Sequence, residues 1–323
     1  GTEAFATEAY NLGRMHQDRG ELDAAREQYR QAVDRMPAFG LGWAALAQAL
    51  DLQGRRGEAL DTLVQGFARS PSMPPGAITG LVDLGEKSGR LDEAGRTLEG
   101  LPAAYKGQAG YHAAWGLYYE KKGVPVESLR AFARALQVDP LDELAIDRTV
   151  AILRRLGREK DAQQFLAEAV GRAEGSVQAL NQIAVVALRQ GWARVAEGLF
   201  RRVLKSDPGN PGVLANLAVS LGQQQRMKEA SDVMREAVRR DPNEGQNHFN
   251  LGAMLAEQGR WGEALASFEE ARAQGLRNSR VQIAMAKMRF RMGDREGTRR
   301  DLQQALALDP ANTEARTLLS QLQ

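Results

Sequence analysis

Residues 40–73 read GLGWAALAQALDLQGRRGEALDTLVQGFARSPSM, with two apolar segments on either side of Gly54. Within each segment the apolar side chains recur at intervals of three and four residues, which predicts two amphipathic helices. These side chains are Leu46, Ala47, Leu50, Ala59, Leu60 and Leu63. Glycine suits the left-handed residue that ends a helix, and Pro71 cannot continue a helix interior. The stretch therefore predicts a helix-turn-helix hairpin.

The same pattern recurs along the chain at a nearly constant interval. Glycines are spaced by 34 or 35 residues, with one double interval in which Gln225 takes the glycine position. They are Gly20, Gly54, Gly89, Gly123, Gly157, Gly191, Gly259 and Gly293. Small residues recur seven positions before and five positions after them, which we expect to let the two helices of a hairpin approach closely. Four turns carry Asp-Pro, a pair typical of turns: Asp139-Pro140, Asp207-Pro208, Asp241-Pro242 and Asp309-Pro310. Such a period indicates a repeat architecture.

These columns resemble the tetratricopeptide repeat (TPR) family, most closely at Trp43, Leu46, Ala47, Ala59 and Pro71. The resemblance implies an all-α fold, a right-handed superhelical α-solenoid whose first helices line a concave groove. We expect a single array over residues 1–323, with a C-terminal helix over 313–323 capped by Thr313. This helix is either a solvating cap of the array or the start of a tenth repeat. The nine expected repeats span 6–39, 40–73, 75–108, 109–142, 143–176, 177–210, 211–244, 245–278 and 279–312.

The third repeat departs from the pattern. It lacks the terminal proline and carries extra glycines at Gly85, Gly95, Gly100 and Gly107. Because glycine lowers helix stability, we expect a distorted or mobile hairpin there.

Composition and motifs argue against catalysis. The chain has no cysteine, and 43 basic against 41 acidic residues give a net charge of +2, which is too balanced for general nucleic-acid or membrane-surface binding. No phosphate-binding, esterase or zinc-protease motif is present. His16, His112 and His248 lie far apart in the repeat order, so we expect structural roles for them. We expect packing or turn roles for Trp43, Trp115, Trp192 and Trp261. We therefore predict a protein that is not an enzyme, without cofactor or metal.

The first helix of each repeat offers a broad face that repeats with the helical period. On the resemblance this face is concave, and it gives the candidate peptide-binding residues. They are Arg148, Arg155, Asn181, Arg189, Asn216, Gln246, Phe249, Asn250, Arg280, Lys287, Phe290 and Arg291. Residues 1–108 carry a net charge of −3 and residues 109–323 a net charge of +5, which favours an acidic partner for the second region. We expect Phe249 and Phe290 to be exposed anchors.

Asn11, Asn216 and Asn250 share one position of this face. Some TPR proteins hold extended peptide backbone with an asparagine ladder there. The other repeats lack asparagine at this position, so we expect a local site around residues 212–291. The residue set of the chaperone-type carboxylate clamp is absent.

The sequence thus predicts a non-catalytic scaffold that binds an extended, partly acidic peptide or protein segment. Two alternatives stay open: a recruiting region of a larger enzyme such as a glycosyltransferase or hydrolase, and an adaptor in bacterial envelope secretion or polysaccharide export. The 35 arginines against 8 lysines favour a bacterial source, and the start at Gly1 favours a processed or excised chain. We expect no membrane span, and a cytoplasmic or periplasmic location. Partner, pathway, compartment and oligomeric state stay open.

Overall fold

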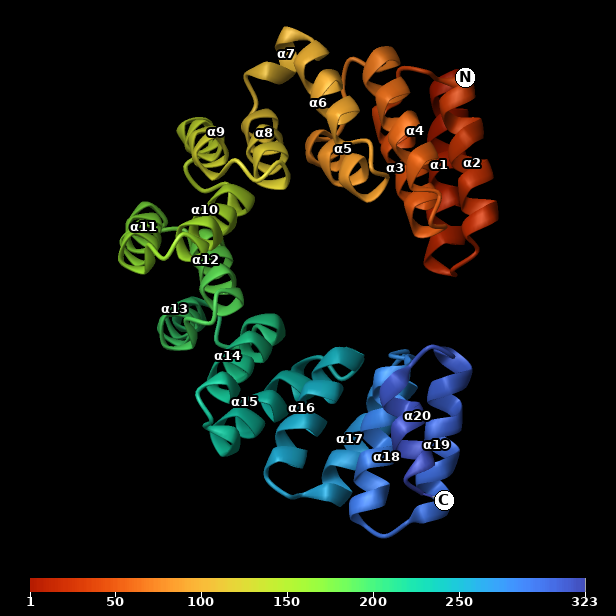
Figure 1. The fold of residues 1–323 in the computed structure, drawn as a ribbon, viewed down its shortest axis with the longest axis vertical. Coiled ribbons are helices and arrows are strands. Elements are labelled where there is room, and N and C mark those ends of the chain that lie inside the picture. The colour runs from red at the N-terminus through yellow and green to blue at the C-terminus, as the bar shows by residue number, and fades with distance from the viewer. Residues whose placement is uncertain (323) are drawn as a thin grey trace. The chain divides into compact units, whose positions relative to one another are not determined.

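The computed structural model of the protein describes residues 1–322, and in this range every regular element is a helix. The predicted all-α fold of tandem hairpins is thereby confirmed (Figure 1). The chain forms two compact units, Gly1–Phe165 (unit 1) and Leu166–Gln323 (unit 2), and each is described by itself. The single array and its repeat boundaries stay predictions.

Unit 1 consists of consecutive helices, most of which pack on the helices next to them in the chain, and α8 also packs on α5. Its helices are α1 (Thr2–Asp18), α2 (Leu22–Arg35), α3 (Gly40–Leu52), α4 (Arg56–Arg69), α5 (Pro75–Lys87), α6 (Leu91–Gly100), α7 (Ala103–Lys106), α8 (Ala109–Lys121), α9 (Pro125–Val138) and α10 (Glu143–Arg155). Helix α11 (Glu159–Arg172) crosses the boundary between the units.

Unit 2 continues with the same alternation of helices and short turns. Its helices are α12 (Val177–Arg189), α13 (Ala193–Ser206), α14 (Pro211–Gln223), α15 (Met227–Arg240), α16 (Gly245–Glu257), α17 (Trp261–Ala273), α18 (Ser279–Arg291), α19 (Arg295–Leu308) and α20 (Thr313–Ser320). The last helix is shorter than the predicted 313–323. Its first backbone N–H groups are capped by Asn312 rather than by Thr313, because the Asn312 Oδ1 accepts a hydrogen bond from the Ala315 amide at 3.0 Å.

The glycines of the repeat end the first helix of each hairpin as predicted. All eight have a positive φ, between +71° and +84°. Gln225, in the one position without glycine, also has a positive φ of 63° and is the only non-glycine residue in that region within the described chain. The left-handed backbone conformation of these turns is therefore imposed by the packing of the two helices. Glycine lowers the free-energy cost of that conformation.

The small residues before these glycines make room for large side chains of the second helix. A Cβ atom added to Gly116 would lie 2.5 Å from a ring carbon of Phe132, which is fully buried. The pairs Gly13 with Tyr29 and Gly252 with Phe268 repeat this arrangement. The predicted close approach of the two helices is confirmed, and an aromatic ring fills the space.

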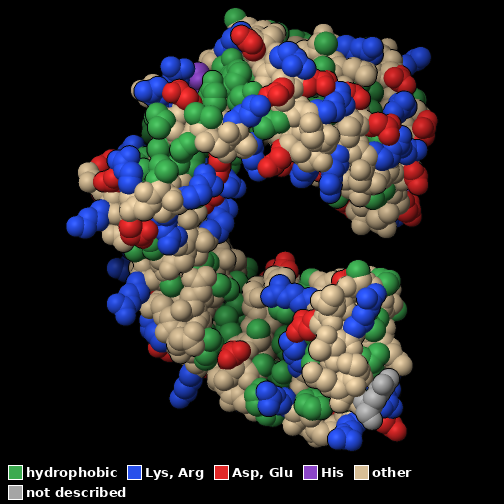
Figure 2. Space-filling view, in the orientation of Figure 1, with side chains coloured by type: hydrophobic (Ala, Val, Ile, Leu, Met, Phe, Trp, Pro, Cys, Tyr) green, Lys and Arg blue, Asp and Glu red, His purple; other side chains and the backbone are tan. Residues whose placement is uncertain are grey.

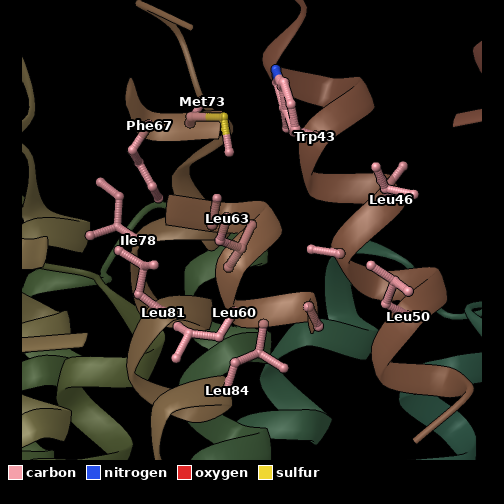
Figure 3. Packing of buried hydrophobic residues seen from close by; sticks show 14 of the residues in the cluster. Trp43, Leu46, Leu50, Leu60, Leu63, Phe67, Met73, Ile78, Leu81 and Leu84 are labelled. Atoms are coloured by element: carbon pink, nitrogen blue, oxygen red, sulfur yellow. The ribbon is translucent and has the colours of Figure 1, made fainter. Parts of the chain in front are cut away.

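The core of unit 1 runs through α2 to α8. Figure 3 shows Leu60, Leu63 and Ile78 of this core among the side chains between α3, α4 and α5. Trp43 is buried as expected, and its indole N–H donates a hydrogen bond to the Pro37 carbonyl at 2.8 Å.

The third hairpin is distorted, as its glycines predicted. Helix α6 ends at Gly100 after 10 residues, whereas α4 and α9 each have 14. The short helix α7 then returns Tyr105 to the core, where its hydroxyl donates to the Ser70 carbonyl at 3.2 Å. The second helix of this hairpin therefore covers less of α8 than its counterparts cover of the helices that follow them.

Candidate functional site

Unit 2 has an apolar hollow of about 590 Å³ near its C-terminal end. Phe290 and Arg291 at the end of α18 line it together with Trp261 at the start of α17. Leu318 of α20 and Leu302 of α19 form the opposite part of the lining. The hollow therefore lies where the last hairpin meets the single helix that follows it.

Helix α20 supplies one wall because its apolar side chains repeat at helical spacing. Leu318, Leu319 and Leu322 pack against the core residues Ile283, Ala286 and Leu302. The same row borders the hollow through Leu318 and Leu322. The helix thus covers the last hairpin only in part.

The hollow is bordered by two cations in different situations. The Lys287 Nζ lies 2.6 Å from the Glu314 Oε1 and is neutralised by that carboxylate. The Arg291 guanidinium carbon lies 5.7 Å from the centre of the Trp261 ring, in cation–π contact. In the part of the chain that the structure describes, no carboxylate pairs with Arg291. Arg291 is therefore a cation without a carboxylate partner at the edge of a hollow whose lining also includes the carboxylate of Glu257.

Phe290 is 54% exposed, as predicted for an anchor. The expectation for Phe249 is wrong, because this ring is only 6% exposed. It packs against Phe268 of α17 with 5.2 Å between ring centres, and the Arg280 guanidinium lies 4.6 Å from its centre. Phe249 therefore belongs to the core, with Arg280 covering its outer side.

The predicted polar residues lie along the first helices of unit 2. The Gln246 amide donates to the Asn250 Oδ1 at 2.9 Å, so these two side chains bind each other across one turn of α16. Asn216 is partly exposed on α14. Asn181, on α12, is also partly exposed, and its buried Oδ1 atom has no hydrogen-bond partner.

The remaining predicted cations do not join the hollow. Arg148 and Arg155 lie on α10 in unit 1, where the Arg155 guanidinium donates to the Glu120 Oε1 at 3.3 Å. Arg148 lines a shallow hollow of about 320 Å³ beside α5 and α8, and its Nε atom has no hydrogen-bond partner. Arg189 is exposed at the end of α12. The structure thus brings together Lys287, Phe290 and Arg291, and leaves the others at separate places.

The three histidines have local partners. The His16 Nδ1 lies 2.5 Å from the Glu21 Oε2, and the His248 Nε2 lies 2.8 Å from the Pro242 carbonyl oxygen. His112 packs edge-on against Tyr111. Across residues 1–322 no three histidine or acidic side chains gather as a metal site.

Sequence comparison identifies the repeat directly. A profile described as tetratricopeptide repeat matches residues 48–243, more than half of the chain. A second profile with the same description matches residues 10–74 and 215–277. The chain belongs to the tetratricopeptide repeat family. The predicted resemblance is confirmed, and the stack of hairpins is a TPR solenoid. Members of this family generally act as non-catalytic scaffolds for other proteins.

Several solved TPR structures are similar to this chain. The anaphase-promoting complex hetero-tetramer Cut9–Hcn1 is 14% identical over 98% of this chain and 76% of that one, with a TM-score of 0.48. YrrB, described as a TPR protein with an unusual peptide-binding site, is 19% identical over 59% of this chain and 99% of that one (TM-score 0.44). PilF of Pseudomonas aeruginosa is 17% identical over 66% of this chain and 97% of that one, with a TM-score of 0.46. No curated protein sequence matches significantly.

Sequence reasoning about this TPR chain missed part of the hollow. Trp261 was expected to serve packing or a turn, yet it is partly exposed and also lines the hollow. The available signal was the pair Leu318 and Leu322, spaced by one helical turn in the last helix. None of the described helices is long and apolar enough to cross a membrane.

Proposed function

We propose that this TPR chain is a non-catalytic scaffold that binds an extended, partly acidic segment of another protein. Its anchoring point is the hollow between α18 and α20 in unit 2. An apolar side chain of the partner enters the hollow beside Phe290, and a neighbouring carboxylate of the partner pairs with Arg291.

The observation that carries the proposal is the combination of an exposed aromatic ring and an unpaired cation at one apolar hollow. Phe290 is 54% exposed, and Arg291 is held by its contact with Trp261. Binding hot spots are enriched in aromatic residues and arginine at well-packed pockets. A guanidinium also pairs with carboxylates in a planar, two-point geometry. The site therefore favours a segment in which apolar and acidic residues are neighbours.

The polar residues of the same face provide for the rest of an extended segment. Asn216 and the Gln246–Asn250 pair offer amide groups that donate to and accept from peptide backbone. Phe249 takes no part, since its ring is buried. The proposed site thus extends beyond residues 212–291, because Leu302, Leu318 and Leu322 complete the lining of the hollow.

The test uses fluorescent twelve-residue peptides in which leucine or phenylalanine alternates with glutamate. Matched peptides carry glutamine or lysine in place of glutamate. We expect the acidic peptides to bind, the glutamine peptides to bind at least about tenfold more weakly, and affinity to fall as salt is raised. Fluorescence anisotropy measures each affinity.

Phe290→Ala and Arg291→Gln should each weaken the acidic peptides by about tenfold or more, a loss typical of hot-spot residues. Lys228→Ala, an exposed cation on α15, is the matched control and should leave the affinity unchanged. Equal binding of the glutamate and lysine peptides, or an unaltered affinity of Phe290→Ala, would refute the site.

A further inference from the structure

Helix α1 of unit 1 exposes two large apolar side chains on one side. Leu12 is 40% exposed and Met15 is 52% exposed. They are three residues apart, so they lie on neighbouring turns of the same helix face. A shallow hollow runs along this face, and within the described chain only α1 side chains line it. This face of α1 is therefore open to contact from outside.

The same face is buried in later hairpins. The residues that correspond to Leu12 in several later hairpins are each at most 7% exposed. They are Leu46, Leu81, Ile183, Leu217, Leu251 and Met285. The second helix of the preceding hairpin packs on such a first helix, as α2 does on α3 and α17 does on α18. The exposed face of α1 thus has the composition of a face that receives another helix.

Two charged side chains flank the apolar pair. Glu8 lies four residues before Leu12, and Arg19 lies four residues after Met15. Arg19 keeps a right-handed backbone conformation, so intervals of four, three and four residues place all four side chains on one side of the helix. Glu8 and Arg19 are exposed, and in the described chain neither has an ion-pair partner. We call Glu8, Leu12, Met15 and Arg19 the α1 stripe.

The α1 stripe is complementary to itself. Its order is acidic, apolar, apolar, basic, and Glu8 and Arg19 lie equally far from the midpoint between Leu12 and Met15. When two copies of the helix lie antiparallel, Glu8 of each copy therefore faces Arg19 of the other, and Leu12 faces Met15. Glu8 and Arg19 are about 16 Å apart along the helix, so the two ion pairs stand on either side of the apolar contact.

We propose that the α1 stripe is a dimerisation surface, and that its partner is the α1 stripe of a second copy of this chain. The two helices pack antiparallel around a two-fold axis, so both copies use the same residues. The apolar side chains exclude water, and the two pairs between Glu8 and Arg19 fix the direction and the register of the helices. This proposal lies in unit 1 and does not depend on the hollow of unit 2.

Other arrangements of two copies fit less well. A parallel arrangement would place Glu8 against Glu8 and Arg19 against Arg19, which like-charge repulsion opposes. An end-to-end arrangement would place the apolar face of α1 on the outer side of α20. That side is polar, with exposed side chains at Arg316, Thr317 and Ser320.

The surroundings and the size of the stripe predict weak association. Figure 2 shows acidic and basic side chains intermingled over the part of unit 1 that contains α1 and α2, so neither sign of charge dominates there. One helix per copy covers less area than the roughly 800 Å² per partner of a standard interface. We therefore expect a reversible dimer with a dissociation constant of about 10–300 µM that rises with salt.

The test is sedimentation equilibrium of the whole chain at about 5–1000 µM, in which the average mass should rise from that of one chain toward that of two. Glu8→Arg and Arg19→Glu should each weaken the dimer at least about tenfold, because each variant places two pairs of like charges across the two-fold axis. Arg14→Glu changes an exposed cation on another side of α1 and is the matched control, which should leave the dissociation constant unchanged. Circular dichroism should show the same helix content in all variants.

A mixture of the two charge-reversal variants completes the test. A mixed pair again has opposite charges at both contacts, so Glu8→Arg and Arg19→Glu should associate with each other about as tightly as two wild-type chains. Loss in each variant alone and recovery in the mixture occur together only when Glu8 of one chain faces Arg19 of the other. A wild-type chain that stays monomeric up to about 1 mM overturns the proposal. Single variants that dimerise like the wild type, or a mixture that does not recover, also overturn it.

Discussion

On α8, Tyr111, Trp115 and Tyr119 form a row of partly exposed aromatic side chains, here called the aromatic row. This row and the hollow beside α18 show two ways in which a repeat protein exposes apolar side chains. In unit 1 the second helix of a hairpin ends early, at Gly100, and leaves the rings of the next helix partly uncovered. In unit 2 a single short helix, α20, follows the last hairpin and covers it only in part.

The two surfaces differ in charge. Arg291 at the hollow has no carboxylate partner in the described chain, whereas the lysines near the aromatic row are paired with acidic residues. Cations of one repeat architecture can therefore differ in how far they are neutralised, because Glu86 and Asp92, which pair with Lys121 and Lys122, come from the preceding hairpin.

The largest expected effect is a loss of acidic-peptide binding that is confined to the hollow of unit 2. Phe290→Ala combined with Arg291→Gln should weaken acidic peptides by about thirtyfold or more. Trp115→Leu in unit 1 should leave their affinity unchanged. Titration of the acidic peptides into both variants measures the affinities. If both variants weaken the acidic peptides equally, the two surfaces are not independent.

A second prediction concerns the close helix contacts that both units share. Gly116→Ala in unit 1 and Gly252→Ala in unit 2 should each lower the free energy of unfolding by about 1–3 kcal/mol, since the new methyl group would overlap Phe132 or Phe268. Thermal unfolding followed by circular dichroism measures the loss.

The matched control for these variants is Gly262→Ala. Gly262 lies in α17, and a Cβ atom there would meet nothing within 4 Å. Alanine should therefore stabilise that helix by about 0.5–1 kcal/mol. A destabilisation by Gly262→Ala equal to that of Gly252→Ala would mean that the contact with Phe268 is not the cause.

A third prediction concerns the pH dependence of stability, which should differ between unit 1 and unit 2 because of Tyr29. Burial raises the pKa of Tyr29 to about 12 from its ordinary 10.0, and its hydroxyl donates to the Gln17 Oε1 at 3.1 Å. The folded state thus holds this proton more tightly than the unfolded state. The resulting stabilisation is complete below pH 10 and is lost as the pH rises toward about 12.

Tyr29→Phe removes this group, so the stability of unit 1 should fall less steeply between pH 10 and pH 12. Urea unfolding at several pH values measures the slope. Phe268, which holds the comparable place in unit 2, does not titrate and provides the internal reference. An identical slope in Tyr29→Phe and in the wild type would contradict the assignment.

The smallest expected effect concerns Gln225, whose φ of 63° lies in the region that glycine adopts easily. Gln225→Gly should stabilise unit 2 by about 0.5–1 kcal/mol, because the strain of a left-handed side chain exceeds the extra chain entropy of glycine. The reverse change, Gly191→Gln, should destabilise by a similar amount. Paired thermal unfolding curves test the sign of both.

Much of the fold was predictable because it repeats local signals. The glycine positions gave the helix ends, and even Gln225 was placed by counting. The N-terminal caps of the first helices also recur along the chain, but the sequence analysis did not predict them. Asp142, Ser176, Asn210, Asn278 and Asn312 each accept a hydrogen bond from the backbone amide three residues on, at the start of a first helix.

The candidate site was only partly predictable. Lys287, Phe290 and Arg291 follow from their place on one face of a helix. The burial of Phe249 did not follow from its helical position, because Phe268 and Arg280, from two other helices, cover this ring.

The period, the helix ends and the family can be read from the amino-acid sequence, since these depend on residues close together in the chain. Which apolar side chains face solvent follows only from the packing of the helices. Exposure depends on the length and side chains of the neighbouring helices, as the contrast between Phe249 and Phe290 shows. It left the rings of α8 partly open because α6 ends early, and it brought Leu318 to the hollow because α20 packs on the hairpin before it.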